Sequence, residues 1–247
     1  MALPGDGGEH MAGRAQLGLL HAFQLSSAGH PVDLPLTAQR LVAFLALHER
    51  PVRRTYVAGV LWPDASEERA ASSLRSALWR LRRSARELVA GTVATLRLSP
   101  AVTVDVLASS RIAKDMDGRA PDLWSAAAGA ELITRFDQDL LPDWYDDWLI
   151  LWRERWHQIR LHALEVLATR LREAGSMAVA IEAGLAAVRA EPLRESGHYV
   201  LIEAHMAEGN MSEAFRQYDS YRSLLWREMR IAPSPRMQAL TSTFTGR

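Results

Sequence analysis

The chain has 247 residues, of which 48% are hydrophobic, and its 29 basic side chains equal its 29 acidic ones. This apolar content supports a packed core and excludes a disordered chain. Because the sequence has no cysteine, disulfide frameworks and thiolate zinc sites are excluded as well. The sequence has neither a signal-peptide pattern nor an apolar run of about 20 residues, so we expect a cytoplasmic protein without membrane contact.

After a flexible glycine-rich leader expected over residues 1–14, the chain is predicted to begin with two strands. Residues 16–34 alternate apolar and polar side chains around a turn centred on Gly29. The period then changes to that of a helix, with Thr37 as the expected N-cap of the first helix. A shorter helix follows, and Pro63 is expected to end it because proline cannot continue the helical hydrogen-bond ladder.

The third expected helix, over residues 64–88, concentrates positive charge. Residues 69–86 hold six arginines and no carboxylate, whereas solvated helix faces usually mix both signs. An apolar stripe is expected to face the core, and it comprises Leu74, Leu78, Leu81, Ala85 and Leu88. Arginine binds phosphates and guanine edges, and small residues let a helix enter the major groove, so we predict that the opposite face contacts DNA. The predicted contacts are Arg69, Ser72, Ser73, Ser76, Trp79, Arg80 and Arg83, with Arg86 at the margin.

The order of elements around this helix predicts a winged helix-turn-helix domain. Residues 92–106 are expected to form a β-hairpin joined at Ser99 and Pro100, so strands, three helices and a hairpin follow one another over residues 15–110. Further DNA contacts are expected at the start of the second helix, whose backbone N–H groups can hold a phosphate, and in the hairpin. The residues concerned are Arg53, Arg54, Thr55 and Arg97.

The remaining residues, 111–247, are predicted to form an all-helical, tetratricopeptide-like domain. Two segments repeat at an offset of 34 residues, which is the period of that repeat. The matched pairs are Leu167 with Leu201, Gly175 with Gly209, Met177 with Met211 and Ala180 with Ala214. The predicted fold class is therefore mainly α with a small β part, namely a winged helix-turn-helix preceded by a β-sheet and followed by a helical domain.

Three blocks of sequence resemble a known family. They are "LPLTAQRLVAFLALHERPVRRTYVAGVLWPDASEERAASSLRSALWRLRR", "LLPDWYDDWLILWRERWHQIRLHALEVLATRL" and "AAVRAEPLRESGHYVLIEAHMAEGNMSEAFRQYDSYRSLLWREMRIAPSPRMQAL". In this order, over residues 15–242, they are similar to the Streptomyces antibiotic regulatory proteins.

The resemblance implies an OmpR-like winged helix joined to a bacterial transcriptional activator domain. It further implies an activator that binds promoter direct repeats in double-stranded DNA as a homodimer, recruits the RNA polymerase holoenzyme and controls a secondary-metabolite or similar pathway. Larger relatives carry a nucleotide-binding module, but no GxxxxGK[ST] loop occurs in this sequence. We therefore expect a short member of the family.

Other chemistry finds little support in the sequence. The aspartates around residues 137–147 lack the order of a calcium loop, and no HExxH or GxSxG motif occurs, so no catalytic residue, metal site or cofactor is predicted. Trp148, Trp152 and Trp156 are expected to form a packing stripe on one helix. Two alternatives to a DNA-binding activator remain open: a tetratricopeptide scaffold whose winged helix contacts proteins, and a regulator that senses a small ligand.

Overall fold

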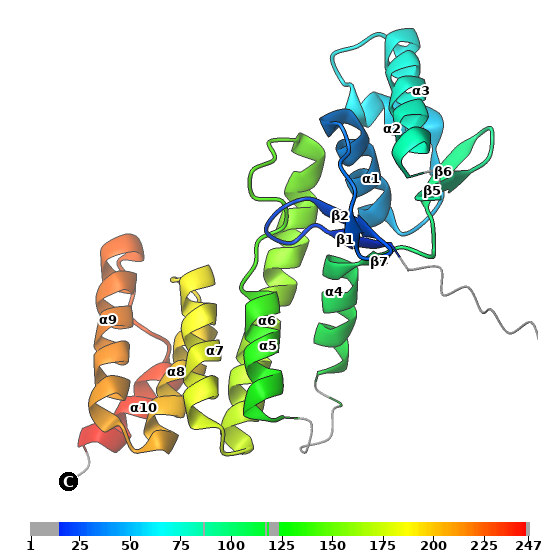
Figure 1. Cartoon of the computed structure of the whole chain (residues 1–247). Coiled ribbons are helices and arrows are strands. Elements are labelled where there is room, and N and C mark those ends of the chain that lie inside the picture. Colours follow the sequence, from blue (N-terminus) through cyan, green and yellow to red (C-terminus); the bar gives the residue numbers. More distant parts are fainter. Residues whose placement is uncertain (1–14, 86, 117, 119–123, 246–247) are drawn as a thin grey trace, which may run out of the picture. The chain divides into compact units, whose positions relative to one another are not determined.

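The computed structural model describes residues 15–85, 87–116, 118 and 124–245 (Figure 1), so the expected leader and Arg86 lie outside the described residues. The chain divides into two compact units that are not contiguous in sequence. The amino-terminal unit comprises Met1–Ala108 and Leu140–Trp152, and the helical unit comprises Ser109–Asp139 and Arg153–Arg247. Each unit is described by itself.

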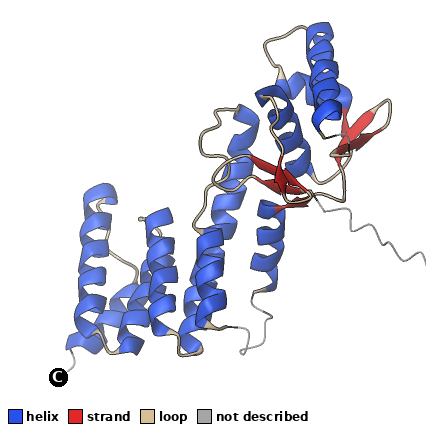
Figure 2. Ribbon diagram, viewed as in Figure 1, coloured by secondary structure: helices blue, strands red, loops and turns tan. Residues whose placement is uncertain are grey.

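The strands of the described residues lie in the amino-terminal unit (Figure 2) and form two small sheets. One sheet has the order β3-β2-β1-β7 and contains β1 (Gln16–Gly18), β2 (Gln24–Ser27), β3 (His30–Pro31) and β7 (Thr103–Val104). The other has the order β4-β6-β5 and contains β4 (Val52–Arg53), β5 (Val89–Gly91) and β6 (Thr95–Leu98). The two strands expected over residues 16–34 are thus three, because His21 adopts a left-handed conformation with φ of 71° and interrupts the alternation.

Three helices of this unit surround one apolar core: α1 (Leu36–His48), α2 (Arg54–Leu61) and α3 (Glu67–Ser84). The core joins all three helices to the second sheet, and its larger members are Leu41, Phe44, Leu45, Val57, Leu61, Leu74, Leu78 and Leu96. The order of strands, three helices and a hairpin, followed by a helical domain, confirms the predicted fold class.

The hairpin after α3 lies earlier in the chain than predicted. β5 pairs with β6, and the Thr92 hydroxyl closes the turn by accepting hydrogen bonds from the N–H groups of Ala94 (3.2 Å) and Thr95 (3.1 Å). The strand expected after Ser99 and Pro100 instead pairs in parallel with β1. Its Val104 is buried there, so burial in the first sheet determines the partner of this short strand, and the predicted hairpin was wrong.

Two predicted helix ends also shift. α3 ends at Ser84, because Ala85 leaves the helical region with φ of −158°. Leu88 is still buried, although it lies beyond the helix. α1 begins at Leu36 rather than after Thr37, since Pro35 occupies the N-cap in an extended conformation and its ring fixes φ.

The segment Leu140–Trp152 packs against α1, although the two are far apart in the sequence. The Leu141 N–H donates to the Leu19 carbonyl at 3.0 Å. Asp146 accepts hydrogen bonds from Arg40 of α1 and from the Trp148 indole N–H, the latter at 3.1 Å. The Trp148 ring packs edge-on against Phe44, with centroids 5.2 Å apart. The core of the amino-terminal unit is therefore completed by this segment.

We expect Trp148→Ala to lower the free energy of unfolding by roughly 2–3 kcal/mol, somewhat less than a fully buried Trp, because its ring is half-buried against Phe44. Tyr145→Ala is the matched control, since Tyr145 lies in the same segment but is 94% exposed. Urea unfolding of the full chain measures both variants. Equal effects of the two substitutions would contradict the packing described for Leu140–Trp152.

The helical unit is built from antiparallel helices in sequence order. Its described helices are α5 (Ala126–Phe136), α7 (Met177–Ala190), α8 (Glu195–Glu208), α9 (Met211–Met229) and α10 (Pro235–Thr245). Two helices cross the boundary between the units, α4 (Asp105–Asp115) after Ala108 and α6 (Ile150–Glu173) after Trp152. In this unit α7 packs on α8, α8 on α9 and α5 on α7. The helix-on-helix arrangement agrees with the predicted tetratricopeptide-like domain.

The 34-residue correspondence appears at the helix ends. Gly175 and Gly209 follow α6 and α8 in left-handed conformations, with φ of 79° and 86°. The N–H group of the next residue then reaches back by five residues, from Ser176 to Leu171 (2.9 Å) and from Asn210 to His205 (2.8 Å). These are equivalent glycine-dependent helix ends. The repeat predicted from the sequence is confirmed.

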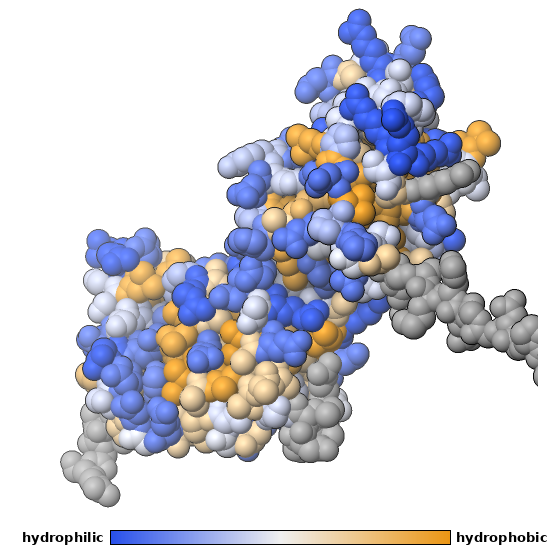
Figure 3. Space-filling view, viewed as in Figure 1, coloured by the Kyte–Doolittle hydropathy of each residue, from blue (hydrophilic) through white to orange (hydrophobic). Residues whose placement is uncertain are grey.

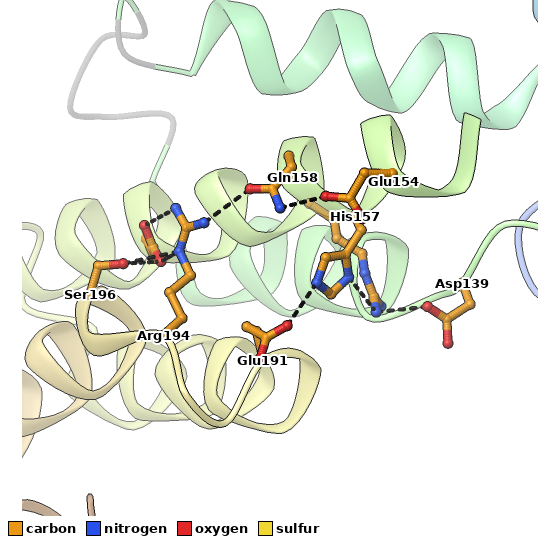
Figure 4. A network of polar contacts seen from close by, with 9 residues as sticks. Asp139, Glu154, His157, Gln158, Glu191, Arg194 and Ser196 are labelled. Carbon is orange, nitrogen blue, oxygen red and sulfur yellow. Dashed lines mark hydrogen bonds and ion pairs between the residues drawn. The ribbon is translucent and has the colours of Figure 1, made fainter. Parts of the chain in front are cut away.

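A polar network ties α6 to the connection between α7 and α8 (Figure 4). The Arg160 side chain, which is 7% exposed, pairs with Asp139 at 2.7 Å and lies 3.5 Å from Nδ1 of His157. On the same helix Glu165 accepts from Arg194 and from the Ser196 hydroxyl, each at 2.6 Å. Buried charges are tolerated only with such partners, so the network fixes the position of α6 in the unit.

The three tryptophans are packed, but they do not form one stripe on one helix, since Trp148 lies in the 3-10 helix Asp147–Leu149 before α6 and the three rings belong to different units. Trp148 and Trp152 contact Phe44 and His48 in the amino-terminal unit. Trp156 is buried in the helical unit, where its indole N–H donates to the Gln138 carbonyl at 2.8 Å.

His198 is buried in the helical unit as a neutral imidazole. Its Nε2 is 2.9 Å from the Pro192 carbonyl, its Nδ1 is 2.7 Å from the Gln217 amide nitrogen, and its ring packs against Tyr221. Burial lowers the pKa of His198, and the bond to Pro192 and the nearby Glu195 carboxylate oppose this only in part. The unfolded chain therefore binds a proton at this histidine more readily than the folded chain.

Because the folded-state pKa is the lower one, His198 should reduce the free energy of unfolding as the pH falls through about 6.5, while above that pH this loss is absent. We expect urea unfolding at pH 7.5 and 5.5 to show a smaller pH dependence for His198→Gln than for the native chain. His162→Gln is the control, since His162 is exposed on α6. An unchanged pH dependence in His198→Gln would contradict the assignment.

Candidate nucleic-acid interface

α3 buries one face in the core and presents arginines on the other. Its buried residues are Ala70, Leu74, Ala77, Leu78 and Leu81. The exposed ones beyond the first turn are Arg69, Ser72, Arg75, Ser76, Trp79, Arg80, Arg82, Arg83 and Ser84. Figure 3 shows hydrophilic side chains over this helix. Among the described residues, no arginine of α3 has a carboxylate within ion-pair distance, so the arginines of this face have no ion-pair partner in that part of the chain.

Trp79 and Arg83 form the centre of this exposed face. Trp79 is 58% exposed, and the Arg83 guanidinium lies over its ring at 4.9 Å from the centroid. Arg80, on one flank, approaches the Thr37 hydroxyl at the start of α1 at 3.5 Å. Ser73, also predicted to contact DNA, is half-buried on this flank. The helix thus offers a cation, an aromatic ring and small hydroxyls side by side.

The sequence reasoning missed Arg75 and Arg82. Both are exposed and stand seven residues apart on the flank of α3 nearer to α2. Their positions on the helix lie outside the apolar stripe, so the spacing of the sequence already indicated that both side chains would be exposed. With them, the exposed cations extend along most of the described length of α3.

The start of α2 lies beside the turn of the hairpin. Arg54 donates from its backbone N–H to the Ala94 carbonyl at 3.0 Å and from Nε to the Thr92 carbonyl at 3.1 Å. Thr55 is exposed in the first turn, and the N-cap residue Arg53 makes no capping hydrogen bond through its side chain. The first backbone N–H group of α2, that of Arg54, is therefore bonded to the hairpin. The next N–H groups of the first turn are not bonded to a capping side chain of Arg53.

Arg97 and Arg53 come together on the second sheet. Arg53 stands opposite Thr95 in the antiparallel pair of β4 and β6, so Arg97 is its diagonal neighbour on the same face. Leu96 points to the other face, where it is buried in the core. These two arginines thus form a second cationic group. It lies on the face of the second sheet that is opposite to the core.

Two further properties of the described residues concern metal-ligand clusters and membrane-spanning helices. No group of three or more His, Asp or Glu side chains among them is arranged to hold a metal ion. None of the described helices combines the length and apolar character needed to cross a bilayer.

Comparison with known proteins agrees with this architecture. Residues 108–244 match the family model described as the bacterial transcriptional activator domain. Over 95% of its length the chain is similar in structure to Mycobacterium tuberculosis EmbR, solved in complex with a low-affinity phosphopeptide, with a TM-score of 0.74 and 21% sequence identity. The chain spans 65% of that structure, and at this identity the likeness concerns the fold. No curated protein matches the chain.

Proposed function

The chain belongs to the bacterial transcriptional activator domain family, and on that premise we propose that it activates transcription by binding specific DNA sequences through α3. The family comprises transcriptional regulators rather than enzymes. The observation that carries the proposal is the face of α3, whose exposed arginines lack carboxylate partners among the described residues.

α3 suits the major groove in length and in chemistry. Its 18 residues extend about 27 Å at 1.5 Å per residue. Ser72 and Ser76 permit close approach, while Arg69, Arg80 and Arg83 can reach phosphates or guanine edges. Arg53, Arg54, Thr55 and Arg97 would add phosphate contacts beside the hairpin. Most of these contacts position the domain, and the arginines at base edges supply specificity.

The helical unit would contact protein rather than DNA. The helical unit, residues 109–139 and 153–247, holds 17 acidic and 17 basic side chains, a balance that adds little affinity for phosphates. α9 also exposes large apolar side chains, with Phe215 at 52%, Trp226 at 57% and Met229 at 54%. We propose that this unit holds a second protomer on adjacent direct repeats and offers a surface to RNA polymerase, so that the protein acts in the cytoplasm on a secondary-metabolite or similar pathway.

Replacing Arg80 and Arg83 with Ala should weaken binding to a DNA site selected from a random library by about 1–3 kcal/mol for each lost base contact. The salt dependence of binding should also become shallower if a phosphate contact is lost. Fluorescence anisotropy at several salt concentrations measures both effects.

The matched control for this experiment is Arg216→Ala with Arg222→Ala, which removes the same charge from exposed ion pairs on α9. Both double variants should unfold at a urea concentration close to that of the native chain, because neither pair lies in a core. Equal DNA affinity in the native and Arg80/Arg83 proteins would exclude the α3 face as the interface.

The proposed direct-repeat geometry predicts a dependence on helical phase. Two head-to-tail domains meet the same side of the duplex when their half-sites are about 10–11 base pairs apart. An insertion of about 5 base pairs between half-sites should therefore reduce cooperative binding far more than an insertion of about 10. Gel-shift titrations on the three spacings provide the measurement, and equal affinity for an inverted repeat would contradict the arrangement.

A further inference from the structure

The facing sides of α2 and α3 enclose a cavity of about 430 Å³, a volume typical of small-molecule sites. Its walls are mostly apolar, and Trp62 and Pro63 of the turn between the helices close one end. All of the lining residues belong to the amino-terminal unit. The cavity is therefore a feature of the helix-turn-helix itself.

Gly59 lines this cavity from the last turn of α2, and glycine is a poorer helix former than alanine. A Cβ atom added to Gly59 would meet no other atom within 4 Å. Gly184 of α7 is different, because a Cβ atom there would lie 3.0 Å from the Cα atom of Leu201. Close helix packing explains Gly184 but not Gly59, which is exposed and has open space where its side chain would begin.

The cavity is cationic at the end away from the turn. Arg54 begins α2 and Arg75 lies two turns into α3, so both stand about 10–12 Å along their helices from the connecting turn. Arg54 uses Nε for the Thr92 carbonyl, and neither guanidinium has a carboxylate partner among the described residues. The acidic lining residue, Glu67, lies at the turn end with Trp62.

We propose that this cavity binds an organic anion with a flat apolar body. The body would lie between Gly59 and Leu74 and reach toward Trp62, while its carboxylate or similar group pairs with Arg54 and Arg75 at the open end. The opposite orientation would place the anion beside Glu67, which repels it. Bound ligand would thus occupy the groove of the helix-turn-helix beside the arginine face of α3.

The test uses 2-naphthoate as the probe and the full chain as the receptor, with binding followed through backbone and indole N–H chemical shifts. A probe of this size should saturate with a Kd of about 1 mM or tighter. The shifts should centre on Gly59, Trp62 and Arg75. Gly59→Leu, which fills the cavity without a clash at Cβ, should abolish binding while leaving the melting temperature equal or higher.

The charge assignment is tested with the neutral analogue 2-naphthamide. Native chain should bind it about tenfold more weakly than 2-naphthoate, and Arg75→Gln should bind both compounds with the same weak affinity. Arg82→Gln is the control, since Arg82 is exposed on α3 but does not line the cavity. It should keep the native preference.

Failure to bind 2-naphthoate would overturn the proposal, and that is also the outcome expected if the cavity receives a side chain of a partner protein. Binding that survives Gly59→Leu, or shifts that map elsewhere, would place the site outside this cavity. Equal affinity for acid and amide would refute the anion assignment. Because no DNA is present, these outcomes are independent of whether α3 binds DNA.

Discussion

The burial of the apolar side of α3 is the interaction on which the amino-terminal unit depends. Leu74 and Leu78 enter the core beneath the helix and Leu81 is buried as well, and this fixes the rotation of α3 about its axis. A rotation that moved Arg75 or Arg82 inward would bury a guanidinium without a partner, at a cost of several kcal/mol. Burial of the leucines and exposure of the arginines are therefore one constraint, and it leaves the arginines of α3 on the surface without ion-pair partners among the described residues.

The same core explains why the unit needs residues from far along the chain. α1 has apolar and aromatic side chains on more sides than α2, α3 and the second sheet can cover. Trp148 covers Phe44, and Asp146 satisfies Arg40 while also accepting from the Trp148 indole. The cost of closing so long a loop grows only slowly with its length, so a few well-packed side chains can hold the segment in place.

The helical unit follows a different logic, in which each helix packs mainly on its neighbours. Left-handed glycines at Gly175 and Gly209 end equivalent helices, and small residues at Ala180 and Ala214 allow close packing. Such repetition determines which helices pack on each other. The position of α6 along its axis relies in addition on ion pairs such as Arg160 with Asp139. Apolar stacking supplies the stability here, and paired buried charges supply a unique arrangement.

The sequence by itself determined the three amino-terminal helices, the apolar stripe of α3 and the 34-residue repeat, because each follows from the regular spacing of apolar or small residues along the chain. Most of the predicted DNA-contacting residues are exposed on α3 for the same reason. Only the tertiary structure decided the position of the hairpin, the placement of Leu140–Trp152 on α1 and the open space beside Gly59. Strands of two or three residues and irregular segments have too few residues to show a periodic pattern that predicts their partner. Their pairing is therefore determined by burial against residues far away in the sequence.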